Sequence, residues 1–238
     1  MNKHNDVIAR CGPGQWYRVA YLNMSDPTQQ CPSSLRLYSA NGVRACGRLS
    51  SAGVYSCSTL SFASGSGHQY SKVCGQVIGY QVGSTDVSFN WQASIDTAYV
   101  DGVSITYGSS PRTHIWTYAA GLSEQLIITD EFASCPCVLA GSSFTPQTPP
   151  SFVRNNYYCE SGNPSSTFEH TDVLRYTSDP LWDGQQCEGQ CCSDRRTPPW
   201  FSVTLANPTT DDIEVRICGS EPTTNEDTPI SLMELYVQ

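Results

Sequence analysis

Cysteine is the feature of this sequence that most constrains its fold. The chain of 238 residues contains twelve cysteines. In a reducing compartment so many thiols would be a hazard, whereas an oxidising compartment converts them into six cross-links. We therefore expect a secreted, disulfide-rich extracellular protein in which every cysteine is paired: Cys11, Cys31, Cys46, Cys57, Cys74, Cys135, Cys137, Cys159, Cys187, Cys191, Cys192 and Cys218.

Metal binding is the competing use of cysteine. No two C-x2-C pairs are present, and the closest cluster, at Cys187, Cys191 and Cys192, contains a vicinal pair that suits a tetrahedral metal site poorly. The pairs Cys191/Cys192 and Cys135/Cys137 are too close in sequence to bridge without strain. We expect each of these cysteines to reach a distant partner and so hold down the long loops 142–151 and 178–199.

Apolar residues recur along the chain with the period of a strand. Val103, Ile105 and Tyr107 alternate with polar residues, as do Ile213, Val215 and Ile217. Turn-rich segments separate these runs. We therefore predict an all-β fold, a disulfide-rich β-sandwich or jelly-roll-like domain with long stapled loops, and helix only as short turns near 130–134. The other predicted strands are 16–22, 72–81, 87–91, 114–118, 125–129, 152–159, 200–205 and 232–237.

Cysteine counts test where the chain can be divided into domains, because a self-contained domain with fully paired cysteines holds an even number of them. A cut between Cys74 and Cys135 leaves five cysteines before it and seven after it, so at least one bridge must cross that segment. A cut near Ser64 leaves four and eight, which allows a self-contained N-terminal lobe of residues 1–64. We favour one domain over 1–238, because residues 69–81 immediately continue as a buried strand.

The charge of the protein lies in its last third. Its formal net charge is −9, and residues 160–238 hold fourteen acidic side chains against four arginines. This balance argues against a nucleic-acid partner, which needs a basic face, and allows divalent cations or cationic partners. No run of eighteen apolar residues is present, so we expect no membrane insertion. The polar residues 1–6 do not resemble a signal peptide, and we expect a mature form without its leader.

Three sets of residues are candidates for binding or modification. In a strand, His114, Trp116 and Tyr118 would form an aromatic row of the kind that stacks on sugars, although core packing gives the same pattern; Trp182 is a further aromatic candidate. Calcium is the candidate cofactor, with Asp211, Asp212 and Glu214 as ligands, and a solvated acidic face is the alternative. Asn23 begins an N-glycosylation sequon, Asn-Met-Ser.

The sequence contains no motif for nucleophilic catalysis. Four histidines and many serines make some Ser/His/Asp combination unavoidable, but the G-x-S-x-G elbow of serine hydrolases is absent. The two carboxylates of a glycoside hydrolase are recognised by their distance in the folded protein, which a sequence does not reveal. We therefore expect a protein without enzymatic activity and keep a secreted hydrolase as the third hypothesis.

Seven runs of the sequence together form a distinctive pattern. They are QWYRVAYLNMSD (15–26), GVRACGR (42–48), YSKVCG (70–75), YVDGVSIT (99–106), PRTHIWTY (111–118), DPLWDG (179–184) and TDDIEVRIC (210–218). These runs resemble a cysteine-rich extracellular module found in secreted and cell-surface proteins of marine invertebrates such as sponges and corals, and the likeness extends from about Cys11 to Gln238. The resemblance implies a compartment and a modular extracellular role, without assigning a catalytic or binding residue.

These observations give three functional hypotheses. The first is a non-enzymatic structural or adhesion module of an extracellular matrix or larger assembly, whose partners are other extracellular proteins or further copies of itself. The second is a lectin-like, carbohydrate-binding glycoprotein assisted by calcium. The hydrolase is the third, and binding to a glycan array with and without a chelator separates the first two.

Overall fold

A computed structural model describes the architecture of most of the predicted strands. It describes residues 3–40, 42–49, 56–63, 67–79, 94–96, 102–122, 151–163, 200–219 and 228–238. The elements in chain order are α1 (Lys3–Cys11), β1 (Tyr17–Asn23), β2 (Leu35–Ala40), β3 (Val43–Arg48), β4 (Ser56–Phe62), β5 (Tyr70–Gly79), β6 (Gly102–Tyr107), β7 (Thr113–Leu122), β8 (Tyr157–Asn163), β9 (Phe201–Thr209), β10 (Ile213–Gly219) and β11 (Ile230–Val237). No helix among these residues is both long and apolar enough to cross a membrane.

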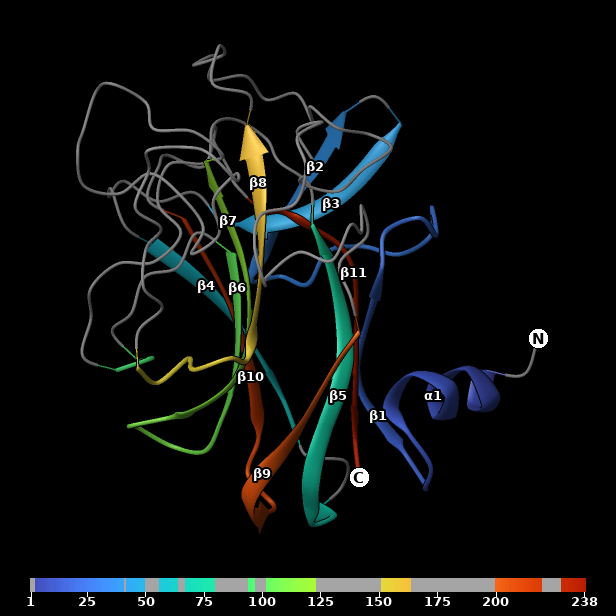
Figure 1. Cartoon of the computed structure of the whole chain (residues 1–238). Coiled ribbons are helices and arrows are strands. Elements are labelled where there is room, and N and C mark those ends of the chain that lie inside the picture. Colours follow the sequence, from blue (N-terminus) through green and yellow to red (C-terminus); the bar gives the residue numbers. More distant parts are fainter. Residues whose placement is uncertain are drawn as a thin grey trace, which may run out of the picture.

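The strands form two sheets (Figure 1). The six-stranded sheet has the order β2-β3-β11-β5-β9, with β1 also paired to β11, and the five-stranded sheet has the order β4-β10-β6-β7-β8. All pairings are antiparallel except the parallel pair of β7 and β8. The last two strands, β10 and β11, therefore lie inside the five-stranded and the six-stranded sheet respectively, and each pairs with strands from the first half of the chain.

One apolar core fills the space between the two sheets. Ile213, Val215 and Ile217 of β10 are fully buried, as the alternating pattern predicts, and they share a cluster with Leu235 and Val237 of β11. Face-to-face packing of the inward side chains of two sheets is the architecture of a β-sandwich. The predicted disulfide-rich all-β fold is confirmed.

The first helix covers part of the outer face of the six-stranded sheet. Its Val7 and Cys11 are one turn apart, and both are buried in a small cluster with Trp16, Cys74 and Tyr236. The helix ends at Gly12, whose φ of 95° lies in the left-handed region that glycine adopts without strain, and whose N–H donates to the Ile8 carbonyl. The sequence prediction expected helix only near 130–134 and missed this helix, because its polar first residues were considered only as evidence against a signal peptide.

Three disulfides cross-link the described part of the chain. Cys11–Cys74 fastens α1 to β5, Cys31–Cys46 fastens the segment after β1 to β3, and Cys57–Cys218 joins the paired strands β4 and β10 across 161 residues of sequence. These bridges indicate an oxidising environment of the extracellular type. The other six cysteines, including both predicted hubs, have side chains outside the described residues.

The strand predictions succeeded where hydrophobic alternation is strong. Strands are confirmed at 16–22, 72–81, 114–118, 200–205 and 232–237 as well as at the two alternating runs, with ends shifted by a few residues. The predicted strand at 152–159 is wrong at its start, because residues 151–155 form a turn and β8 begins at Tyr157. Strands β2, β3 and β4 were missed; the predictions at 87–91, 125–129 and 130–134 lie outside the described residues.

Arg48 ties the two sheets together at one end of the sandwich. It ends β3 of the six-stranded sheet, and its guanidinium is buried with 0% exposure. Nη1 donates to the Gly219 carbonyl of β10 at 2.5 Å and to the Ser56 hydroxyl of β4 at 3.0 Å, both in the five-stranded sheet. A methyl group at position 219 would overlap the Arg48 guanidinium, so this contact requires glycine there.

We predict that Arg48→Lys destabilises the protein far more than a surface exchange of the same kind. A lysine ammonium cannot reproduce the planar fork of donors, and so buried acceptors lose their partners at a cost of about 3 kcal/mol in unfolding free energy. Arg10→Lys changes an exposed residue of α1 and should cost less than about 0.5 kcal/mol. Urea unfolding with intact disulfides measures both, and equal midpoints for the two variants would contradict the role of Arg48.

Candidate functional site

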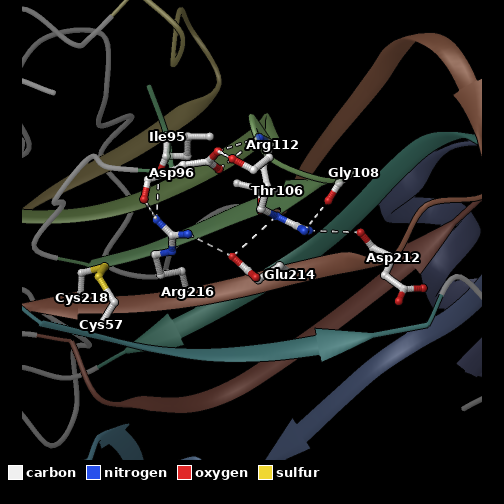
Figure 2. A network of polar contacts seen from close by, with 11 residues as sticks. Cys57, Ile95, Asp96, Thr106, Gly108, Arg112, Asp212, Glu214, Arg216 and Cys218 are labelled. Atoms are coloured by element: carbon white, nitrogen blue, oxygen red, sulfur yellow. Dashed lines mark hydrogen bonds and ion pairs between the residues drawn. A yellow bond between two sulfur atoms is a disulfide. The ribbon is translucent and has the colours of Figure 1, made fainter. Parts of the chain in front are cut away.

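The outer face of the five-stranded sheet carries a network of polar side chains (Figure 2). Ser104 and Thr106 of β6 alternate with core residues and therefore point away from the core, yet both are almost fully buried. Glu214 and Arg216 occupy the corresponding outward positions of β10. Buried polar groups are costly unless they are hydrogen-bonded, so the partners of these side chains show what the network does.

Glu214 lies between two arginines. Its Oε1 is 3.3 Å from Nη2 of Arg216 and 3.6 Å from Nε of Arg112. Nε of Arg112 also donates to the Thr106 hydroxyl at 2.8 Å. The carboxylate thus balances part of the positive charge on the two guanidinium groups.

The two arginines also hold backbone segments against the sheet. Nη1 of Arg216 donates to the carbonyls of Ile95 and Asp96 at 2.9 and 2.8 Å, and Arg112 donates to the carbonyls of Gly108 and Asp212 (Figure 2). The Asp96 carboxylate in turn accepts from the Arg112 N–H at 3.0 Å and from the Ser110 hydroxyl at 2.8 Å. The network therefore fixes the turn between β6 and β7, on which Arg112 lies.

Beside this turn the surface forms an open groove with a volume of about 660 Å³. Three segments build it: the β6–β7 turn, the turn at 151–156, and β9 at the edge of the six-stranded sheet. Its size lies within the range of small-molecule binding sites. The lining residues are Tyr107, Pro111, Arg112, Thr113, His114, Ser151, Phe152, Arg154, Asn156, Val203, Thr204, Leu205 and Ala206.

The lining of the groove is cationic. It contains Arg112 and Arg154 and no aspartate or glutamate, in a protein whose net charge is −9. Arg154 is exposed, and its φ of 54° places a non-glycine residue in the left-handed region. Such backbone conformations cost free energy and concentrate at functional sites. The groove therefore offers an exposed cationic side chain, that of Arg154, to an anionic ligand.

His114 forms one wall of the groove as a neutral imidazole. Burial lowers its pKa to about 4. Nε2 lies 2.8 Å from the Thr117 hydroxyl, the ring meets Phe152 edge-on, and Nδ1 has no hydrogen-bond partner among the described residues. The Thr117 hydroxyl in turn lies 3.3 Å from the Ser104 hydroxyl, and both residues are buried, with 0% and 3% exposure.

The structure separates the predicted aromatic row. A β-bulge at Ile115 shifts the register, so that Ile105 pairs with Trp116 but Thr106 pairs with His114. The prediction that His114 shares a face with Trp116 and Tyr118 is therefore wrong.

Trp116 and Tyr118 lie in the core. They are 4% and 0% exposed, and Trp116 stacks on Phe201 of the opposite sheet with a ring separation of 4.5 Å. Core packing, the alternative weighed from the sequence, describes these two rings. Trp182 lies outside the described residues.

The predicted calcium ligands surround the start of β10 without converging. Asp211 and Asp212 are exposed, and Glu214 contacts two arginines. The Asp211 carbonyl accepts from the Tyr70 hydroxyl at 2.8 Å, so backbone as well as side chains of this segment serve packing. No group of three or more His, Cys, Asp or Glu in the described segments has the geometry to hold a metal ion. Calcium binding stays a prediction.

The sequence offered little signal for the groove residues. Arg112 lies within a motif that we noted, PRTHIWTY, but Phe152, Arg154 and Asn156 belong to a turn that resembled a strand. Their proximity to β9, some fifty residues later, arises only from the packing of the two sheets. The chain matches no protein-family model, no curated protein and no solved structure. Its function is therefore argued from the groove itself.

We predict that His114 makes the fold sensitive to acid. The unfolded chain binds a proton at this histidine below its ordinary pKa of 6.5, whereas the native state does not until about pH 4. The unfolding free energy contributed by His114 is thus complete above pH 6.5 and declines as the pH falls toward 4, by on the order of 2 kcal/mol between pH 7 and pH 4.5.

Urea unfolding of the wild type and of His114→Gln at both pH values isolates this contribution from that of the carboxylates. The variant should lose about 2 kcal/mol less than the wild type on acidification. His68→Gln, at an exposed position, is the matched control for removing one imidazole. Parallel pH profiles for the wild type and His114→Gln would show that His114 is not the sensor.

Proposed function

We propose that this protein is a secreted, non-enzymatic extracellular adhesion module that binds acidic saccharides in the groove between the β6–β7 turn and β9. The disulfides and the likeness to extracellular modules of marine invertebrates support the compartment. The sequence has no G-x-S-x-G elbow, which supports a role without covalent catalysis.

The single observation that carries the ligand class is the cationic lining of the groove. Arg154 is exposed and available to a carboxylate or sulfate, and Arg112 lines the same groove with its guanidinium held by Glu214 and Thr106. Arginine pairs with planar or tetrahedral anions through two parallel hydrogen bonds. A ligand anion would be attracted to this groove, whereas the acidic remainder of the protein would repel the anion.

The remaining lining residues suit a sugar better than a small inorganic anion. Phe152 and Tyr107 offer aromatic surface to the C–H face of a ring. Thr113, Asn156 and Thr204 offer hydroxyl and amide groups to sugar hydroxyls. With a volume of about 660 Å³, the groove has room for more than one sugar residue.

A structural role in a larger assembly is the second candidate. A specific observation favours it: disulfides and buried arginine contacts link segments as far apart as Arg48 and Gly219. Such links resist unfolding under proteolysis or load, which a matrix component needs. In that case the partner is a further copy of the chain or another matrix protein, and no saccharide is required.

A binding experiment with charge-matched variants distinguishes the candidates. The probes are uronic-acid and sulfated hexasaccharides, with a neutral hexasaccharide as reference, titrated in calcium and in chelator. We predict that the anionic probes bind and that Arg154→Gln weakens them about tenfold, since a charge-assisted hydrogen bond contributes about 1.5–3 kcal/mol. Added salt should weaken binding as well.

Arg10→Gln is the matched control, because it removes one exposed positive charge at a residue that does not line the groove. Its affinity should stay within twofold of the wild type. Equal affinity for neutral and anionic probes, or equal losses in both arginine variants, would overturn the groove as the site. Self-association without saccharide binding would favour the structural candidate. Cleavage of the hexasaccharides during the incubation would reveal a hydrolase.

A further inference from the structure

The sequon asparagine has a defined conformation at the end of β1. Oδ1 of Asn23 accepts from the N–H of Ser25 at 3.1 Å and from the Ser25 hydroxyl at 2.7 Å. Because Oδ1 is engaged on this side, the amide nitrogen Nδ2 points to the other side, where it donates to the Tyr21 hydroxyl at 3.3 Å. Nδ2 is the atom to which an N-linked sugar attaches, and it is directed along the outer face of the six-stranded sheet.

A second groove lies on that face, next to α1. Its volume is about 290 Å³, room for about one sugar ring. Strand pairing places Tyr21 opposite Glu234 and Asn23 opposite Leu232, so Asn23 and Tyr21 share the groove with β11. The lining residues are Asp6, Val7, Arg18, Tyr21, Asn23, Trp200, Leu232, Glu234 and Tyr236.

The lining has the chemistry that recognises a sugar. Tyr21 is 38% exposed, with the Arg18 guanidinium 4.5 Å from the centre of its ring, and Trp200 stacks on Tyr236 at 6.2 Å. Aromatic surface packs against the C–H face of a pyranose, while Arg18 and Glu234 provide a donor and an acceptor for an acetamido group and hydroxyls. An arrangement of this kind with an attachment atom on its rim fits a sugar that is tethered there.

We propose that Asn23 carries an N-linked glycan whose first N-acetylglucosamine lies in this groove against the ring of Tyr21. The inference rests on the proposed secretion but not on the saccharide groove. In the transfer, Nδ2 forms a bond to C1 of the sugar and loses one proton, and the C1–O bond to a polyprenyl-diphosphate donor breaks, releasing the polyprenyl diphosphate. The linked nitrogen keeps one N–H.

The first test asks whether the sugar is present. The chain is secreted from a eukaryotic cell line, and its intact mass is measured before and after treatment with an endoglycosidase that leaves a single N-acetylglucosamine. We expect one glycan on the wild type and none on Asn23→Gln. An unmodified Asn23 in the secreted protein would overturn the proposal, while saccharide binding in the other groove would be unaffected.

The second test asks where the sugar lies. The form with one N-acetylglucosamine should melt about 2–4 °C above the same sequence made without glycosylation in the bacterial periplasm. Tyr21→Ala should abolish this difference. Tyr17→Ala is the matched control, because Tyr17 is 39% exposed on the same strand but does not line the groove, and it should keep the difference.

A measurement on the wild type keeps the test decisive if Tyr21→Ala is not secreted. Nuclear Overhauser contacts should connect the sugar protons to the Tyr21 ring. A glycan that shows no such contacts, or a melting difference that persists in Tyr21→Ala, would show that the sugar extends into solvent.

Discussion

The burial of β10 and β11 in the interior of their sheets is the constraint on which the rest of the structure depends. Each strand pairs on both edges, β10 with β4 and β6, and β11 with β1 and β5. The inward side chains of both strands meet in one core. Sheets of this kind gain their stability from apolar area that is buried only when the two layers pack together. The early strands therefore depend on residues that follow them by more than a hundred positions.

The same arrangement determines what the outer faces can do. On the five-stranded sheet, Glu214 and Arg216 point outward because their neighbours in β10 point inward, and with Arg112 they fix the β6–β7 turn. On the six-stranded sheet, Arg18 and Tyr21 point outward from β1 and face β11. The first proposed sugar site thus lies between two turns and the edge strand β9, and the second lies on the six-stranded sheet beside α1. Pre-organised sites of this kind lose little entropy when they bind a ligand.

Local patterns in the sequence predicted the parts of this architecture that depend on local physics. The alternation in β6 and β10 predicted strands because each has one apolar and one polar face. Strand β4, with the sequence SCSTLSF, buries only Leu60 deeply and so carries almost no alternating signal. The bulge at Ile115 arises from pairing between β6 and β7, and no local pattern marks it. The groove is even harder to predict from the sequence, because Arg154 and β9 come together only in the folded chain.

Native-state hydrogen exchange tests most directly whether the two sheets form one cooperative unit closed by β10 and β11. The amides of Val215 in β10 and Leu235 in β11 are core positions of opposite sheets. If one core and the Arg48 contacts join the layers, both amides should exchange only through global unfolding, with the same free energy and the same dependence on denaturant. Exchange of Val215 at a lower free energy, while Leu235 stays protected, would show that the five-stranded sheet opens by itself and would contradict this account.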